Sequence, residues 1–296
     1  MTLPYQIYYN GNLLKDTFGK IQDIWRGDFS VALKNGSIMK YIIQFLKGLD
    51  IFFIIIFTDG NIQSDLIRDI LKETKHDYNK IKSKIIVGTL AQKIEDENLN
   101  YLYMPLDDKI FDDGIVFDNL IPWKDRESIA YWRGGASGWG GLETLRCRVV
   151  EKLLNYKDAD VKLIKRGWEQ GKNIPDSFFG EKVHFRKFMD YKIFLIIDGN
   201  CIASNHMWGF ATGCIPFIIS DATCWFQKFL IPDVNYIHIN YDLSNLIEKI
   251  EWVINNDSEA EKIAENAVQF SKTYFNPDFQ RKHIQEQMSN VISKII

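Results

Sequence analysis

Three short turns in this 296-residue sequence combine glycine with charged or hydrogen-bonding side chains, and each follows a predicted strand. They are Asp59-Gly60, Arg133-Gly134-Gly135-Ala136-Ser137-Gly138 and Asp198-Gly199-Asn200. Glycine lets a backbone approach an anionic group closely, and an arginine guanidinium offers a planar pair of donors to phosphate oxygens. A turn that leads into a helix also presents backbone N–H groups at the positive end of the helix dipole. The three turns therefore predict a binding site for a diphosphate.

Each turn also has a simpler interpretation. Asp-Gly pairs commonly do no more than reverse the chain. The glycines at 133–138 are not spaced as in the dinucleotide fingerprint, so their spacing alone fits a flexible loop equally well. The residues by themselves leave both interpretations open.

The strands that would position these turns are short and apolar. Residues 51–57 form a continuous β-branched and aromatic run, typical of a strand buried on both faces, and strands are also predicted at 128–132 and 192–197. The last of these continues into a helix over 203–210 and a buried strand over 214–219, which together make a βαβ unit. Since α/β proteins bind anionic ligands at the carboxyl ends of parallel strands, we expect the three turns to converge on one cleft.

Strands alternate with helices in both halves of the chain, with a boundary near Pro122. Residues 1–35 predict a peripheral hairpin, and the acidic segment 106–118 predicts a loop. Further strands are predicted at 84–89, 101–106, 161–165 and 236–239. Helices are predicted at 37–46, 64–75, 142–154 and 224–230. Three more helices follow: one that begins at 242, one from 258 to about 275, and a last one within 276–296. The economical architecture is two Rossmann-like domains that face a cleft.

Composition excludes several classes of function. The net charge of −3 and the pI near 6.0 give no support for a nucleic-acid partner. The most apolar run, 51–57, is too short to span a bilayer, so we expect no transmembrane segment, while peripheral membrane contact stays open. Cys147, Cys201, Cys214 and Cys224 have apolar neighbours and no metal-ligand spacing, so we expect buried thiols in a reducing compartment. The N-terminus lacks the pattern of a signal peptide, which favours a cytoplasmic location.

The ordered series of motifs between 128 and 275 resembles the capsule-associated-protein-like glycosyltransferases, family 90. This family includes the protein O-glucosyltransferases and bacterial lipopolysaccharide-modifying transferases. The matching stretches are 130–138, 191–200, 213–218, 232–237, 242–246, Trp252 and 255–257. In the first half, the similarity rests mainly on the strand that ends in Asp59.

The resemblance implies a GT-B-like fold, a UDP-sugar donor and inverting transfer of a hexose or pentose, such as glucose, xylose or galactose, without a metal or other cofactor. Residues 1–121 would be the acceptor-side domain, 122–275 the UDP-sugar-binding domain, and 276–296 a helix that crosses back to the first. The acceptor would be a hydroxyl of a glycan or a protein. Asp59 would be the general base, although without the resemblance it is more simply a turn aspartate.

The resemblance also implies a set of residues that bind the donor. Arg146 and Arg148 project roughly 200° apart on a helix, so we expect one of them, preferably Arg146, to face the site. Trp139 is the tryptophan best placed to stack on the sugar or the base. The full set is Arg133, Gly134, Gly135, Ser137, Trp139, Arg146, Arg148, Asp198, Gly199, Asn200, Ser204, Asn205 and His206.

One position departs from the family pattern. Members commonly carry an arginine a few residues after the Asp-Gly turn, and this chain has Asn205 there, followed by His206. Either His206 or another cation takes the place of the missing arginine, or donor binding is weakened. The simpler interpretation of His206 is a histidine on the helix surface. Asp158 and Asp160 form a D-x-D pattern, but we expect them to lie in a solvated loop and not to bind a metal. The alternative to an enzyme is a non-catalytic protein that binds a nucleotide sugar or acts as a scaffold.

Overall fold

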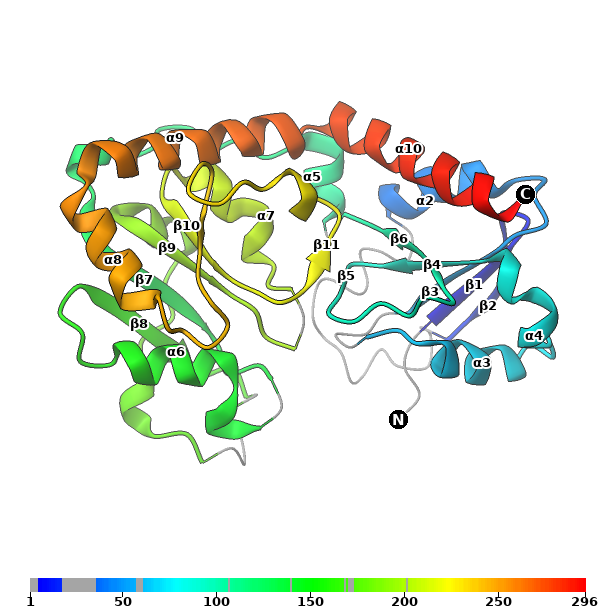
Figure 1. The fold of residues 1–296 in the computed structure, drawn as a ribbon, viewed down its shortest axis with the longest axis horizontal. Coiled ribbons are helices and arrows are strands. Elements are labelled where there is room, and N and C mark those ends of the chain that lie inside the picture. The colour runs from blue at the N-terminus through cyan, green and yellow to red at the C-terminus, as the bar shows by residue number, and fades with distance from the viewer. Residues whose placement is uncertain are drawn as a thin grey trace. The chain divides into compact units, whose positions relative to one another are not determined.

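The computed structural model describes residues 5–17, 36–56, 61–105, 107–138, 140–167, 169, 173–200 and 202–296. The chain forms two compact units (Figure 1). The first unit comprises residues 1–114, 222–227 and 275–296, and the second comprises 115–221 and 228–274. Each unit is built on its own five-stranded sheet with helices on both faces, which confirms the predicted α/β class.

The sheet of the first unit is mixed, with the strand order β2-β1-β3-β4-β6. The strands β3, β4 and β6 run parallel, whereas β1 is antiparallel to both β2 and β3. The strands are β1 (Tyr5–Tyr9), β2 (Asn12–Asp16), β3 (Phe52–Ile56), β4 (Ile85–Thr89) and β6 (Asn100–Tyr103). A separate antiparallel pair joins β5 (Ala91–Gln92) to β11 (Thr223–Cys224).

Helices cover both faces of this first sheet. Apolar residues of α2 (Ser37–Ile43), α5 (Asp108–Asp113) and α10 (Pro277–Ile295) pack on one face. Those of α3 (Ser64–Lys72) and α4 (Tyr78–Ile81) pack on the other. Every residue of β3 is buried, as expected for a continuous apolar run inside a three-layer unit.

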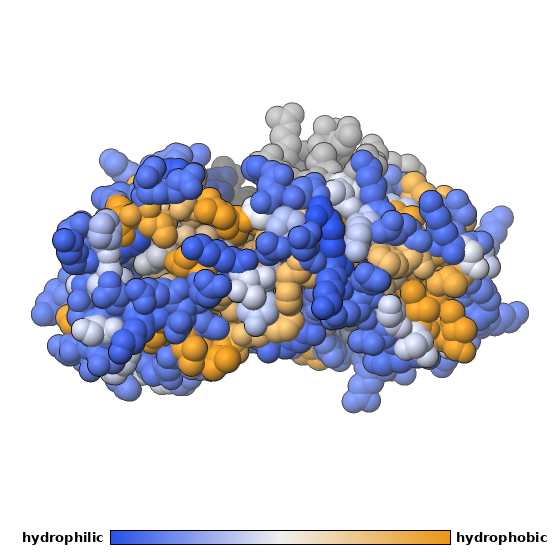
Figure 2. Space-filling view, turned by 90° about the horizontal axis from the view of Figure 1, so that it is seen from above, coloured by the Kyte–Doolittle hydropathy of each residue, from blue (hydrophilic) through white to orange (hydrophobic). Residues whose placement is uncertain are grey.

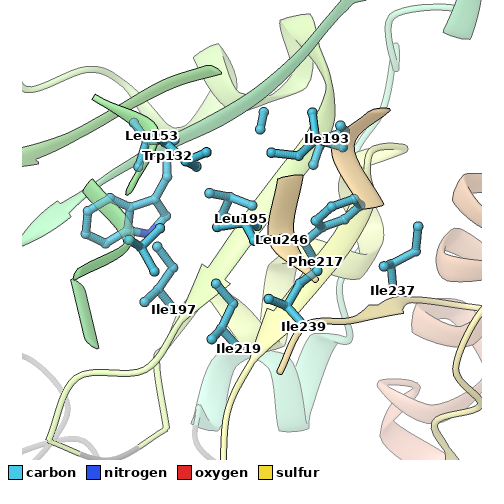
Figure 3. Close-up of a cluster of buried hydrophobic side chains, with 14 of the residues drawn as sticks. Trp132, Leu153, Ile193, Leu195, Ile197, Phe217, Ile219, Ile237, Ile239 and Leu246 are labelled. Carbon is cyan, nitrogen blue, oxygen red and sulfur yellow. The ribbon is translucent and has the colours of Figure 1, made fainter. Parts of the chain in front are cut away.

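The sheet of the second unit is entirely parallel, with the order β12-β10-β9-β7-β8. Its strands are β7 (Glu127–Gly135), β8 (Ala159–Ile164), β9 (Tyr191–Ile197), β10 (Ile215–Ile219) and β12 (Ile237–His238). Its helices are α6 (Leu145–Leu153), α7 (Asn205–Gly209), α8 (Leu246–Asn255) and α9 (Asp257–Tyr274). Figure 3 shows one face of this sheet, where Trp132, Leu195 and Phe217 pack with Leu153 of α6 and Leu246 of α8.

The acidic segment was predicted to be a loop, and this is wrong for residues 108–113, which form α5. Asp107 caps the helix, since its Oδ1 accepts the N–H of Ile110 at 3.0 Å. Ile110 and Phe111 are buried, so this acidic helix has an apolar side that packs in the core. The high density of aspartates concealed both the cap and the two apolar positions.

Three other predicted elements differ from those in the structure: the N-terminal hairpin, the start of α8 and the helix predicted at 224–230. The hairpin is not peripheral, because β1 pairs with β3 along five residues of the main sheet. Asp242 does not cap α8, which begins at Leu246; its carboxylate accepts the N–H of Ser244 in the preceding turn. Residues 224–230 hold the end of β11 and a short 3-10 helix, Gln227–Phe229.

None of the helices among the described residues is long and apolar enough to cross a membrane. Figure 2 shows mainly hydrophilic side chains on the face that it presents, with smaller hydrophobic patches between them.

Candidate active site

The first predicted turn of the second unit connects β7 to α6. The strand ends at Gly135 and the helix begins at Leu145, and Gly138, Gly140 and Gly141 between them have φ values of 112°, 114° and 59°. Glycine adopts such angles more easily than any other residue, which explains why three glycines occupy these positions. Gly134 has another role, because a Cβ there would lie 2.2 Å from the Trp132 ring. The loop therefore leads directly to the amino end of α6, where backbone N–H groups and the helix dipole favour an anion.

The second turn follows β9 and is anchored by Asp198, which is 1% exposed. One carboxylate oxygen, Oδ1, accepts the N–H of Ala203 at 2.9 Å and lies 3.0 Å from His206 Nε2. The other, Oδ2, accepts the hydroxyl of Ser220, the residue after β10. The carboxylate is thus turned into the protein, where it connects the end of β9 to Ala203, His206 and Ser220. A buried carboxylate needs such partners, since an unpaired one is costly.

The two turns lie against each other. A Cβ on Gly199 would come within 2.2 Å of Ser137 Oγ, so a larger residue there would displace the Ser137 hydroxyl from its present position. Arg146 of α6 joins the two strand ends, donating to the carbonyl of Gly135 at 2.9 Å and to that of Ile197 at 3.1 and 3.2 Å. This brings a glycine-rich loop, a second glycine turn and a guanidinium together at the carboxyl edge of a parallel sheet. That arrangement suits a diphosphate.

The two arginines of α6 have different partners. Arg146 lies at the two turns, as just described, whereas Arg148 donates to the backbone oxygen of Tyr241 at 3.1 Å. Tyr241 follows β12, so Arg148 connects α6 to a loop at the same edge of the sheet. Which of the two cations binds a donor stays a prediction.

Arg133 forms an ion pair that the sequence did not indicate. Its Nη2 lies 2.7 Å from each carboxylate oxygen of Asp160, and its side chain is 12% exposed. The prediction that Asp160 lies in a solvated loop is wrong, because it belongs to β8. In the parallel register Arg133 pairs with Lys162, and Asp160 pairs with Tyr131. The guanidinium therefore reaches back towards the amino end of β8, away from the turn, and its contact with a donor stays a prediction.

The residues after the second turn begin α7. Asn205 opens this short helix, and its Nδ2 is 3.5 Å from the carbonyl oxygen of Leu195. Ser204 is exposed at the N-cap, and Asn200 is half-buried in the turn. His206 is 2% exposed, so the interpretation of a histidine on the helix surface is wrong. Its ring contacts Asp198 within the loop anchor.

Three predicted residues lie outside the described residues: Asp59, Trp139 and Cys201. The strand β3 ends at Ile56, three positions before Asp59 in the sequence. The other cysteines, Cys147, Cys214 and Cys224, are buried, as predicted. Among the described residues, no three or more His, Cys, Asp or Glu side chains form a group that could hold a metal ion.

Sequence reasoning missed two residues that shape this region. Ser220 is the first residue after the predicted strand 214–219, but the turn there, Ser220-Asp221-Ala222, has no glycine and was therefore not selected. Asp160 was noticed only for its spacing to Asp158. Its pairing with Arg133 depends on the register between β7 and β8, which spacing along one strand does not reveal.

Comparison with known proteins agrees with this geometry. Residues 116–294 match the model of glycosyl transferase family 90, which is more than half of the chain. The chain belongs to glycosyltransferase family 90. The match includes both turns of the second unit and the whole of its sheet.

Several relatives of this family 90 chain are similar in sequence. Uncharacterized protein 179R of Invertebrate iridescent virus 6 is 27% identical over 91% of the chain and 26% of its own length. Human protein O-glucosyltransferase 1 is 29% identical over 53% of the chain and 40% of its own length. O-glucosyltransferase LpsA of Dichelobacter nodosus is 22% identical over 55% of the chain and 49% of its own length. The chain thus spans less than half of the length of each of these relatives.

Two solved structures show a more distant likeness. A glycosyltransferase from Rickettsia africae aligns over 77% of the chain and 80% of its own length, with 12% identity and a TM-score of 0.42. The C-terminal domain of the group 1 glycosyl transferase LpcC from Francisella tularensis aligns over 55% of the chain and 99% of its own length, with 15% identity and a TM-score of 0.35.

Proposed function

We propose that this family 90 chain is an inverting glycosyltransferase that uses a UDP-sugar as its donor. The observation that carries the proposal is the contact between the turns after β7 and β9, with the Arg146 guanidinium joining them. A leaving diphosphate gains negative charge as the glycosidic bond to it breaks. Fixed N–H donors and a nearby cation stabilise that charge without reorganising.

The donor diphosphate would lie over the loop 136–144 and the turn at Gly199. The amino end of α6 and Ser137 Oγ would donate to its oxygens, and Arg146 would supply positive charge. Asp198 would hold the turn in place and would not contact the donor. Its carboxylate is buried and is hydrogen-bonded to Ala203, His206 and Ser220 instead. This assigns different roles to residues that the sequence grouped as one donor-binding set.

The chemical step would use Asp59 as the general base. Its carboxylate would take the proton of an acceptor hydroxyl while that oxygen forms a bond to the anomeric carbon. The bond between this carbon and the UDP oxygen breaks at the same time, and its electron pair leaves with the diphosphate. Attack from the side opposite the leaving group inverts the configuration, and no metal is required by these groups. A positioned base of this kind is typically worth about 10²–10⁴-fold in rate.

Glucose is the donor sugar that the relatives favour, since two of them are named O-glucosyltransferases. Xylose and galactose remain in the proposal, because small differences in the pocket decide among sugars. The acceptor would be a hydroxyl of a glycan or a protein. A cytoplasmic location remains part of the proposal.

Release of UDP tests the proposed function. Purified protein is incubated with UDP-glucose, UDP-xylose or UDP-galactose, with and without EDTA and candidate acceptors. We expect one donor to yield UDP above the blank rate, and EDTA to leave that rate unchanged. If no donor released UDP with any acceptor, the proposal that the chain is an enzyme would be wrong. If EDTA abolished UDP release, the proposal that the reaction needs no metal would be wrong.

A second candidate is a protein that binds a nucleotide sugar without turnover. Two observations favour it: Asn205 stands where family members commonly carry arginine, and the Arg133 guanidinium is paired with Asp160. Both lower the positive charge available to a leaving diphosphate. A thermal shift with UDP separates the candidates, because a ligand of the folded state raises the melting temperature whether or not it is turned over. A shift without UDP release would support the binding protein.

A further inference from the structure

Two large apolar side chains are exposed at the carboxyl edge of the second sheet. Tyr241 is 40% exposed and Leu142 is 42% exposed. Leu142 lies in the short 3-10 helix Gly141–Glu143, which comes just before the N-cap of α6, and Tyr241 follows β12. Both therefore border the region that holds the two glycine turns. An aromatic side chain has a large apolar face and, in tyrosine, a polar end, so it suits a contact at the border of such a region.

The loop that carries Tyr241 is held in one conformation by its own hydrogen bonds. The N–H of Asn240 donates to Asn245 Oδ1 at 2.9 Å, and the N–H of Ser244 donates to Asp242 Oδ1 at 2.9 Å. Leu243 is buried and has a φ of 63°, an angle that non-glycine residues rarely adopt. Backbone strain of this kind persists where the surroundings fix it, and it gathers at ligand sites. The tyrosine is thus presented on a preorganised loop.

Arg148 ties this loop to the first turns of α6. Its Nη2 donates to the Tyr241 carbonyl at 3.1 Å, and its guanidinium carbon lies 5.9 Å from the centre of the Tyr241 ring. Arg148 lies on the same helix as Arg146, which joins the two glycine turns. The aromatic ring is therefore positioned by the helix whose amino end faces the proposed diphosphate site.

We propose that Tyr241 is the platform on which the nucleobase of the donor stacks, an inference that rests on the proposed function. The strands β9, β10 and β12 are neighbours, so two strand spacings, about 10 Å, separate the ends of β9 and β12, which lead into the turn at Gly199 and the loop of Tyr241. A nucleoside that extends from a diphosphate at Gly199 along this edge brings its base to that loop. An aromatic face accepts a base by stacking, and Arg148 keeps the ring in place.

Calorimetric titration of UDP and of inorganic pyrophosphate into the full chain tests this assignment. Tyr241→Ala should weaken UDP binding about tenfold, because the base loses its stacking partner. The same variant should bind pyrophosphate as the original protein does, since pyrophosphate has no base. Tyr241→Phe should retain UDP affinity, because it keeps the aromatic face.

Phe185→Ala is the matched control. Phe185 is 39% exposed, but it precedes β9 and so lies at the amino end of the sheet, and we expect this variant to bind UDP normally. Unchanged UDP affinity in Tyr241→Ala would overturn the nucleobase platform. So would an equal loss of UDP and pyrophosphate, which would indicate a general disturbance of the site. If the original protein bound no UDP at all, the proposed function itself would fail.

Discussion

Arg133 and Arg146 lie on consecutive elements, β7 and α6, but their guanidiniums are directed to different places. Arg133 pairs with Asp160 and lies 4.7 Å from the centre of the Tyr131 ring, and its buried Nε has no hydrogen-bond partner among the described residues. Arg146 donates to two backbone oxygens at the ends of β7 and β9 and is half-buried. The Arg146 guanidinium therefore lies at the two turns where an anion would bind, whereas that of Arg133 lies beside Asp160.

Substitution of both arginines tests this distinction. We expect Arg146→Ala to raise the Kd for UDP about tenfold or more, since a charge-assisted contact is lost. For Arg133→Ala and Asp160→Ala we expect a similar fall in the melting temperature, because each leaves the other partner unpaired. Calorimetry and thermal unfolding of all three variants measure these effects. A large loss of UDP affinity in Arg133→Ala, with normal affinity in Asp160→Ala, would instead assign Arg133 to the donor.

Asp59 is the residue on which the proposed chemistry depends. Asp59→Asn should lower turnover about 10²–10⁴-fold, because an amide is not basic enough to remove the proton from the hydroxyl of the acceptor. The Kd for UDP should stay nearly the same, since Asp59 is assigned to the acceptor and not to the diphosphate. Initial rates of UDP release and calorimetric titration give the two values. Turnover retained in this variant would remove Asp59 as the base.

At the scale of elements, the two glycine turns hold their places because β7 and β9 are adjacent in a parallel sheet. Their carboxyl ends lie at the same edge, and α6 returns over that edge with Arg146. The sequence predicted the strands well, because β3, β9 and β10 are continuous apolar runs. It predicted α5 and the start of α8 poorly, since acidic residues there serve as local caps and turns.

Close packing of the turns leads to a steric test. Gly199→Ala places a methyl group 2.2 Å from the present position of Ser137 Oγ, so the Ser137 hydroxyl or one of the turns must move. We expect at least about tenfold weaker UDP binding, because the donors of both turns lose their alignment. The double variant Gly199→Ala with Ser137→Gly removes the opposing side chain and should recover part of the affinity. Normal UDP binding in Gly199→Ala alone would show that the turns do not form the site.

A second test at this scale concerns the start of α9. Asp257 Oδ1 lies 2.5 Å from Nζ of the buried Lys192 and accepts the Trp123 indole N–H at 3.1 Å. Asp257→Asn leaves the Lys192 ammonium without its counter-charge, and we expect a loss of roughly 1–3 kcal/mol in the free energy of unfolding. Lys192→Met in the same background should recover part of this loss. Urea unfolding of the single and double variants gives the values.

The same pair predicts a dependence on pH. The hydrogen bond from Lys192 holds the pKa of Asp257 below its usual value. A carboxyl group with a lowered pKa in the folded state stabilises fully above its unfolded pKa, near 4, and this contribution is lost as the pH falls through the folded value. The difference in stability between the original protein and Asp257→Asn should therefore be constant from pH 5 to 7 and smaller at pH 3. A difference that grows towards acid would contradict this role.

At the scale of the whole molecule, the sequence was sufficient for the class of fold. Alternating apolar strands and amphipathic helices predicted two α/β units, and the structure has two five-stranded sheets that are covered by helices. The C-terminal helix α10 packs on the sheet of the first unit, together with α2 and α5. The candidate site was predictable only as a set of turns. Its internal contacts were not, because the Arg133–Asp160 pair and the Asp198–His206–Ser220 anchor join residues from different strands and loops.

A crystal structure of the chain with UDP would locate the donor site. We predict that the diphosphate lies against Gly199 and Ser137, near the amino end of α6 and the Arg146 guanidinium, with the base on the Tyr241 ring. Density for UDP at any other place, under conditions where calorimetry shows the protein to be saturated, would contradict the assignment of this edge of the second sheet as the donor site.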